Sequence, residues 1–506
     1  MELFDGRHDD RIEGVIECFD RVVIRGTFKK ISYQGAIEVE MWKRGIRFFD
    51  YAKWAKESKD AIRDHVQALA DEHELEIHHI QKRSIRKEDF VRERIKDEPD
   101  KEGIVCILSA MEGCMSYRPS YDKETKRCSL RPRTGLCLHY YVYINDPVLG
   151  LCFMAFPTWL PFSIRFYFNG HNWLQKQFDE HGIDYTMDDN CFTKIGDYEA
   201  AQKLANGFKI RSGLVRQLRK WSRCCLPTPI KEFGMPYWTL HEVEFATDVI
   251  FENAKSLTAL YDEVVHTALV EVKTKNIATF LDRSLKGSKF DATSRIRECR
   301  EGTSVRHNLG KASMKMYDKR GTVLRVETVL NDVSFLKVER MVNHKDGTQS
   351  RKKAGVKKSI YSLNILQKLM SRANKRYLTY IGGMQERSLE LATLRKLTSP
   401  VKDGAIGRTV RGINLFNSDD ELLLQALLSG GISLQGFTGR QLRYSHLKGW
   451  SPGKVSRALK RLRLHGLIKK KGKSYSYYLT KLGKRVIAPL LKIKTRIIIP
   501  ELCQLT

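Results

Sequence analysis

The sequence contains no apolar run long enough to cross a membrane. A membrane helix needs about 20 consecutive apolar residues. The nearest approach, residues 150–164, contains two prolines and is followed by Arg165. Residues 1–10 include four acidic side chains, a composition that secretory signals do not have. We therefore expect a protein that stays inside the cell and has no membrane partner.

Cysteine pairs of the kind that bind zinc are also missing. There are 11 cysteines, and none of them forms a C-x-x-C motif. Structural zinc sites are usually built from such closely spaced pairs. We expect reduced, mostly buried thiols, and neither zinc nor a nucleotide as cofactor.

Acidic residues are scarce relative to basic ones. Lysine and arginine number 89 against 59 aspartates and glutamates, so the formal net charge is +30. Such a surplus favours a polyanionic partner, and nucleic acid is the usual one. The length of 506 residues predicts two to four domains. No internal repeat is visible in the sequence.

Hydrophobic patterns predict a multidomain α+β protein. A β-like run covers 21–28, and helical periodicity covers 61–73. Strand-like runs follow at 104–108, 138–145, 150–156 and 163–168, and then a short helix that ends at Gly182. The predicted divisions are an N-terminal mixed α/β region over 1–100, a β-rich accessory region over 101–235, an α+β core over 236–400, a linker over 401–417 and a C-terminal domain over 418–506.

Several polar residues of the β-rich region could line a site. They are Glu112, His139, Asn169, His171 and Asp189. The alternative is that each is a hydrogen-bonded polar residue at the rim of a sheet, and the sequence does not decide between the two.

The region from 240 to 335 has the most informative order of elements. A strand over 243–251 precedes an amphipathic helix over 257–272, whose apolar residues recur at i, i+3, i+4 and i+7. Strands over 304–308, 312–318 and 322–330 follow. The turn Asp318-Lys-Arg-Gly321 predicts a hairpin between the last two strands. The expected result is a helix with an antiparallel sheet.

Chemically useful residues fall on common faces of these strands. Because side chains alternate along a strand, Glu244 and Asp248 share a face, as do Lys315, Tyr317 and Lys319, and as do Arg325 and Glu327. If the faces coincide, three carboxylates meet cations and a tyrosine. Carboxylates hold a hard divalent metal, cations offset charge developing on a phosphate, and a tyrosine can attack phosphorus. The alternative is a hairpin with cross-strand ion pairs.

The C-terminal part is strongly basic. Residues 436–496 hold eighteen lysines and arginines and no acidic residue. Ser418 and Glu421 suggest a capping box that opens a helix, and helices are expected over 437–444 and 451–465, the second with Pro452 at its first position. A hairpin over 467–480 follows.

Helix, helix and hairpin resemble the winged helix-turn-helix family over about 418–490. In that family the second helix enters the major groove, and the hairpin contacts phosphates. The resemblance implies binding of double-stranded DNA, with RNA as the alternative partner. The residues expected to contact it are Lys454, Arg457, Lys460, Arg461, Arg463, Lys469, Lys470, Lys471 and Lys473.

The core motifs resemble a second family, the rolling-circle replication initiators of the replication-initiation-factor type. The similar segments are Glu244-Phe-Ala-Thr-Asp248, Gly310 to Lys319, and Leu324-Arg-Val-Glu327. The resemblance implies a nickase and strand transferase that uses Mg²⁺ or Mn²⁺. It implies Glu244, Asp248 and Glu327 as metal ligands, and Lys315, Tyr317, Lys319 and Arg325 as neighbouring catalytic residues. The nucleophile stays open between Tyr317 and Tyr377.

The leading hypothesis is therefore a DNA-processing enzyme of a mobile element or replicon. It would act in the cytoplasm, associated with the nucleoid, on a double-stranded site that becomes single-stranded during the reaction. The alternatives are a non-catalytic DNA-binding regulator and a protein that binds a structured RNA. Residues 1–240 have no assigned role.

Overall fold

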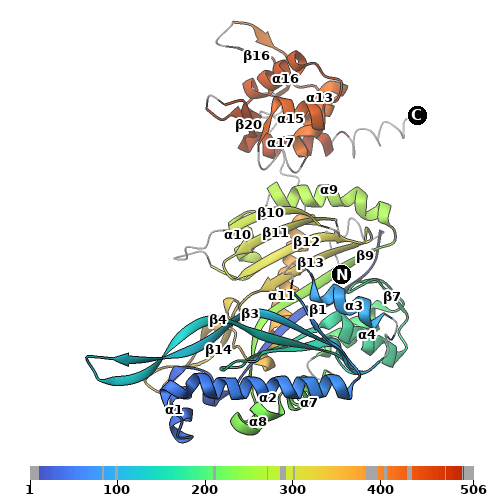
Figure 1. The fold of residues 1–506 in the computed structure, drawn as a ribbon. Coiled ribbons are helices and arrows are strands. Elements are labelled where there is room, and N and C mark those ends of the chain that lie inside the picture. Colours follow the sequence, from blue (N-terminus) through green and yellow to red (C-terminus); the bar gives the residue numbers. More distant parts are fainter. Residues whose placement is uncertain are drawn as a thin grey trace. The chain divides into compact units, whose positions relative to one another are not determined.

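The computed structural model describes residues 11–81, 85–96, 98, 101–208, 212–270, 272–284, 292–299, 302–382, 397–403, 407–429, 436–472, 474–492 and 494. The chain divides into two compact units (Figure 1). The larger unit comprises 10–254 and 277–377, and the smaller one 255–276 and 378–506. Within the described residues, no helix is long and apolar enough to span a membrane.

One eleven-stranded sheet forms the larger unit, with strand order β10-β11-β12-β13-β9-β1-β6-β5-β4-β3-β2. All neighbouring strands are antiparallel except β2 and β3. Strands from all three predicted regions of residues 1–400 lie in this sheet. Their bounds are β1 Ile12–Thr27, β2 Ile77–His79, β3 Gly103–Asp122, β4 Arg127–Asp146, β5 Gly150–Pro157, β6 Ser163–Asn169, β9 Tyr237–Phe251, β10 Ala292–Cys299, β11 Gly302–Leu309, β12 Ala312–Lys319 and β13 Val323–Leu330.

Helices connect these strands. They are α1 Gln34–Lys43, α2 Tyr51–Glu72, α3 Lys87–Ile95, α4 Gly170–His181, α5 Tyr198–Asn206, α7 Leu214–Cys225, α8 Pro227–Phe233, α9 Ala254–Val270, α10 Thr274–Phe280 and α11 Leu363–Gly382. Two small hairpins are added, β7 Tyr185–Met187 with β8 Phe192–Ile195, and β14 Lys337–Asn343 with β15 Gln349–Gly355. Aromatic side chains fill much of the core beside β1, where the Phe19 ring lies against Phe208 and Phe245.

The predicted strands and the short helix are confirmed, with different ends. β1 begins at Ile12 instead of 21, and α4 ends as expected at Gly182, which has φ +65°. The β12–β13 hairpin is also confirmed: Arg320 and Gly321 both have positive φ, and Gly321 N donates to Asp318 Oδ1 at 2.9 Å. Positive φ suits glycine, which has no Cβ.

The large sheet contains an internal repeat that the sequence does not reveal. The first half begins with β1 and the helices α1 and α2, to which β2 and α3 are added. Its meander β3–β6 ends with β6 paired back on β1, and α4 follows. β9, two helices and the meander β10–β13 end with β13 paired back on β9, and α11 follows later. The first strands of the two halves pair antiparallel, with Arg21 opposite Glu244. The sheet therefore has an approximate twofold axis at this pair.

The smaller unit contains a compact helical module with a three-stranded sheet. Its elements are β16 Val401–Lys402, β17 Thr409–Val410, α13 Ser418–Leu428, β18 Phe437–Thr438, α15 Gly439–Ser445, α16 Pro452–Leu464, β19 Ile468–Lys470, β20 Ser476–Leu479 and α17 Lys481–Lys492. Its core includes Leu423, Leu442, Leu459 and Leu462. Taken together, the chain is a mixed α and β protein with a mainly antiparallel sheet, which is consistent with the α+β class.

Two helix caps in this module bear on the sequence predictions, and one of them is at a different residue from the predicted one. Ser451 caps α16 through its side chain, with Pro452 at the first turn. The predicted cap of α13 at Ser418 is wrong, because the side chain of Asn417 accepts from Asp420 N and the helix already begins at Ser418. Asparagine and serine cap equally well, so the sequence does not distinguish these neighbours.

Candidate active site

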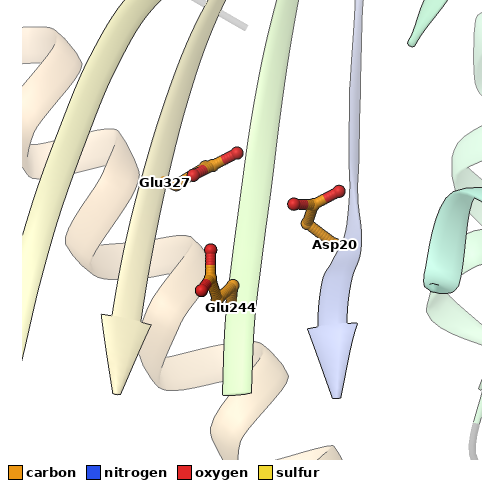
Figure 2. Close-up of side chains that lie close together, drawn as sticks. All are labelled: Asp20, Glu244 and Glu327. Atoms are coloured by element: carbon orange, nitrogen blue, oxygen red, sulfur yellow. The ribbon is translucent and has the colours of Figure 1, made fainter. Parts of the chain in front are cut away.

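Three carboxylates meet on one face of the large sheet. Ligand atoms of Asp20 on β1, Glu244 on β9 and Glu327 on β13 all lie within 4.8 Å of one another. Figure 2 shows the three side chains converging from adjacent strands. We call these three residues the acidic cluster.

A bulge in β1 brings Asp20 into the acidic cluster. Phe19 pairs with Phe245 and Arg21 with Glu244, so Asp20 is an extra residue without a partner on β9. Bulges of this kind redirect a side chain. Gly170 packs against the bulge so closely that a Cβ there would lie 2.1 Å from Phe19 O, which ties the start of α4 to this point.

Lys315 and Tyr317 project from β12 toward the acidic cluster. Lys315 Nζ donates to Glu244 Oε2 at 2.7 Å and to Glu327 Oε2 at 3.1 Å, and Tyr317 OH donates to Glu327 Oε1 at 2.5 Å. Burial lowers the pKa of Lys315, but Glu327 and Glu244 outweigh it and raise that pKa above its usual value. Burial, with Glu327 second, holds the pKa of the Tyr317 hydroxyl well above its usual value.

The pKa of the Glu244 carboxyl is raised above its usual value. Burial raises the pKa of its carboxyl; Lys315 opposes this rise, while Glu327 and Asp20 add to it. A cluster in which a carboxylate resists ionisation beside a lysine has room electrostatically for a further cation.

Asp248 lies with Arg325 instead of in the acidic cluster. Arg325 Nε and Nη2 donate to the two Asp248 oxygens, each at 2.6 Å, and both side chains are fully buried. Burial raises the pKa of Asp248, but Arg325 and His171 outweigh it and lower the pKa to about 2. Sequence analysis placed Asp248 with the metal ligands, and the structure puts Asp20 beside Glu244 and Glu327.

One nitrogen of Arg325 has no hydrogen-bond partner. Its Nη1 is buried without a hydrogen bond, 3.5 Å from Asp20 Oδ1 and 3.9 Å from Glu327 Oε1. An unsatisfied buried donor is costly. The guanidinium therefore presents an unused donor at the acidic cluster.

Polar residues from the 169–190 segment support Asp20. Asn190 Nδ2 donates to Asp20 Oδ1 at 2.8 Å and Asn169 Nδ2 at 3.3 Å, and His171 Nδ1 lies 3.2 Å from the same oxygen. The buried Lys319 donates to Asn190 Oδ1. Of the polar residues singled out from the sequence, Asn169 and His171 thus belong to this site.

Other candidates lie elsewhere. Tyr377 is fully buried, and its hydroxyl lies 3.0 Å from His307 Nε2. His307 neighbours Arg306, which pairs with Lys315, so His307 and Tyr377 are on the opposite face of the sheet from Tyr317. Glu112 binds Lys87, Tyr141 and Arg165, and Asp189 pairs with Arg92. His139 is buried and binds Cys137 O.

Sequence reasoning missed Asp20 and Asn190. Asp20 directly precedes the run that predicts the first strand, so a strand extended by a few residues would have included it. Its inward direction depends on the bulge, which no local signal announces. Asn190 stands in a loop, and the sequence gives no reason to connect it with β1.

Among the described basic residues of the C-terminal module, some form ion pairs and others are exposed with no acidic partner within 4.0 Å. Lys454 pairs with Asp419 at 2.8 Å, Lys460 with Asp403 at 2.5 Å, and the buried Arg461 with Asp420. Arg457, Arg463, Lys469 and Lys471 are exposed, and Lys470 Nζ lies over the Tyr475 ring. Lys473 lies outside the described residues.

Comparison with known proteins identifies no family. No family model matches the chain, and no curated protein matches it. A solved structure, that of the rolling circle replication initiator protein from Geobacillus stearothermophilus, is similar over 71% of this chain and 97% of its own, at 9% identity and a TM-score of 0.18. A likeness at this level carries no argument about fold or activity, and the function has to be argued from the site itself.

Proposed function

We propose that the protein is a metal-dependent enzyme of a mobile element or replicon that nicks DNA and transfers the strand through a tyrosine. The observation that carries this proposal is the acidic cluster, with Tyr317 hydrogen-bonded to one of its members and the unused Arg325 Nη1 directed at it. Carboxylates, a hydroxyl nucleophile and a cationic donor with unused hydrogen-bonding capacity are groups that phosphoryl transfer can use.

The acidic cluster fits a hard divalent cation. Asp20, Glu244 and Glu327 supply only oxygen ligands, which Mg²⁺ and Mn²⁺ prefer, and these ligand atoms lie within 4.8 Å of one another. When bound, the metal would polarise the phosphodiester and offset the charge that develops on it. Lys315 already lies between Glu244 and Glu327, so it would share their oxygens with the ion.

Tyr317 is the proposed nucleophile. Its Oη would form a bond to phosphorus while one P–O bond of the DNA strand breaks, and its proton would pass to Glu327, which already accepts its hydrogen bond at 2.5 Å. The departing strand oxygen takes a proton, which the Lys315 ammonium can donate. Arg325 Nη1 would bind a non-bridging phosphate oxygen. Tyr377, on the other face of the sheet, would have a packing role.

The C-terminal module would select the DNA site as a winged helix. Its order of helices and its basic hairpin support this role, and Arg457 and Arg463 on α16 and Lys469 and Lys471 on the hairpin are free to contact DNA. Phosphate contacts would come mainly from the hairpin lysines.

A covalent-adduct assay tests the proposal. The full chain is incubated with labelled DNA from the flanks of its own gene, with or without Mg²⁺ or Mn²⁺, and products are separated on a denaturing gel. We expect a metal-dependent protein–DNA band that Tyr317→Phe and Glu327→Gln abolish and the control Tyr377→Phe retains. A band lost in Tyr377→Phe but kept in Tyr317→Phe would contradict the assignment.

A non-catalytic DNA-binding protein is the second candidate. The favouring observation is that Lys315 already forms ion pairs with both Glu244 and Glu327, which gives these carboxylates a structural role. This reading predicts DNA binding that is independent of metal, with neither cleavage nor adduct, and Glu327→Gln would then alter only the free energy of unfolding.

A further inference from the structure

The outer halves of β3 and β4 form a two-stranded ribbon. β5 pairs with β4 only from His139 onward, and β2 pairs with β3 at Ile107–Ser109. Among the described residues, 111–122 and 127–138 therefore pair only with each other. At roughly 3.4 Å per residue, twelve residues span about 40 Å. Figure 1 shows this ribbon, which we call the β3–β4 ribbon, reaching away from the rest of the sheet.

One face of the ribbon carries an unneutralised arginine group. Arg118 stands directly opposite Arg131, and Ser116 opposite Arg133, so the three arginines share a face. All three are exposed, and within the described part of the chain none of them forms an ion pair within 4.0 Å. Like charges directly opposite each other destabilise a β-ladder. Asp122, on the same face, offsets Arg131 in part, and a bound anion would offset the remaining positive charge.

The opposite face is covered by the protein itself only around Tyr117 and Leu130. Tyr117 and Leu130 are buried, and the Tyr117 ring packs at 6.2 Å from Tyr51 at the start of α2. On α1, Glu38 accepts a hydrogen bond from Leu130 N at 2.7 Å. Elsewhere this face exposes Met111, Met115, Tyr121 and Leu136 and carries no arginine, so an anionic partner would meet the arginine face.

The arginine face continues the face that bears the acidic cluster. Along β3, Arg118 and Glu112 are on the same side, and Arg165 Nη2 on β6 donates to Glu112 Oε2 at 2.9 Å. Along β6, Arg165 and Asn169 are on the same side. Asn169 pairs with Arg21 on β1, which in turn pairs with Glu244 on β9. Directly opposite residues project to the same side of a sheet, so the two groups lie on the same side, and α3 packs on the strands between them.

We propose that the arginine face of the β3–β4 ribbon binds the backbone of duplex DNA next to the strand held at the acidic cluster. The major groove is about 12 Å wide and admits a two-stranded ribbon, and arginine binds phosphate oxygens in a bidentate manner. The inference rests on the proposed function in one respect, that DNA is the substrate. It assigns a role to part of the region for which the sequence suggests none.

The test measures binding of the full chain to a labelled 30-base-pair duplex between 50 and 200 mM salt by fluorescence anisotropy. The variant is Arg118→Ala/Arg131→Ala/Arg133→Ala. The matched control, Lys43→Ala/Lys53→Ala/Lys56→Ala, removes the same charge from exposed positions of α1 and α2. Each lost phosphate contact lowers the log–log salt slope by roughly 0.9, so we expect the variant's slope to fall by about 2 to 3 and its Kd to rise about tenfold.

A charge-preserving variant and the cleavage assay separate the outcomes. Arg118→Lys/Arg131→Lys/Arg133→Lys should retain most of the slope, since lysine also neutralises phosphate. A slope equal to that of the control, or a change in oligomeric state without a change in DNA binding, would overturn the inference. If the salt slope of the arginine variant falls but the chain never cleaves DNA, the proposed enzymatic activity is wrong and the ribbon contact with DNA is supported. If the chain cleaves DNA but the slope is unaltered, the enzymatic activity is supported and the ribbon contact is wrong.

Discussion

At the scale of single residues, the buried pair of Arg325 and Asp248 is the most demanding contact of the site. Neither side chain is exposed, and the guanidinium makes two 2.6 Å hydrogen bonds to the carboxylate. Breaking such a pair leaves one buried charge uncompensated, which typically costs about 3–5 kcal/mol. The pair holds Arg325 in place, so its free Nη1 stays directed at Asp20 and Glu327.

This pair predicts acid sensitivity. The folded-state pKa of Asp248 is about 2, below the ordinary value of 3.8, so its contribution is present above about pH 4 and is lost as the pH falls toward 2. The difference corresponds to about 2 kcal/mol. We expect the loss of unfolding free energy between pH 5 and pH 2.5, measured by urea denaturation, to be smaller by about that amount in Asp248→Asn.

The control for this measurement is Asp64→Asn, at an exposed position of α2. It should lose as much stability between the two pH values as the unmodified chain. If Asp248→Asn also follows the unmodified chain, Asp248 is not the acid-sensitive group.

The sequence predicts which residues of the site share a face of the sheet, because side chains alternate along a strand. Glu244, Glu327, Lys315, Tyr317 and Arg325 were expected on one surface, and they lie together there, while their chemical roles stay predictions. Alternation puts Asp248 on that surface too, but it cannot tell which carboxylate an arginine takes as partner. That choice depends on the distances between β9, β13 and the bulged β1.

At the scale of elements, α16 differs most from its expected state. A helix that enters the major groove should present free cations, yet Lys454, Lys460 and Arg461 are paired with Asp419, Asp403 and Asp420. These acids lie before residue 436, outside the stretch whose basic composition is apparent in the sequence. The module thus neutralises part of its own proposed DNA-binding helix.

Removing two of these acids should therefore strengthen DNA binding. In Asp403→Asn/Asp419→Asn, Lys454 and Lys460 become available to phosphates, so we expect the salt slope to rise by about 1 to 2. Anisotropy with duplex DNA measures it. Glu57→Gln/Asp64→Asn on α2 removes equal charge at exposed positions, and an equal rise in that control would attribute the effect to net charge alone.

Elements with strong periodicity were predictable, and those held by pairing alone were not. The strands of the β12–β13 hairpin and the helix α4 follow their apolar patterns closely. For β3 and β4 the apolar runs at 104–108 and 138–145 mark only the part that other strands cover. Their outer halves carry arginine, serine and glycine, which give no strand signal although backbone pairing continues to Asp122 and Arg127.

At the scale of the whole molecule, the approximate twofold axis relates two arginines. The central pair of the axis is Arg21 on β1 and Glu244 on β9. Four residues further along β1, Arg25 pairs with Arg165 on β6. Four residues further along β9, Asp248 pairs with Arg325 on β13. Each arginine binds a carboxylate: Arg165 binds Glu112, and Arg325 binds Asp248. Only the Arg325 half is next to the acidic cluster.

The two halves should consequently respond differently to the same substitution. Arg325→Lys loses the bidentate pair and the free Nη1, so we expect adduct formation to fall by at least about a hundredfold. Arg165→Lys should leave it within about threefold. Thermal unfolding monitors folding of both variants, and equal losses of adduct would show that the halves act as one site.

The repeat could not be predicted because equivalent positions carry unrelated side chains. Tyr167 takes the place of Glu327, and Phe153 that of Lys315, as the strand registers show. What the halves share is their order of strands and their pairing about one axis, and neither property is local in the sequence.

The spread of the acidic cluster along the chain has a consequence during synthesis. Asp20 and Glu327 are 307 positions apart, the difference of their residue numbers, and Glu327 reaches Asp20 only when β13 joins the sheet beside β9. At roughly 5 to 20 residues per second, translation takes about 15 to 60 s to cover that interval. A nascent chain therefore holds no complete cluster until late in elongation, and a truncated product released before β13 would lack Glu327 and with it the proposed site.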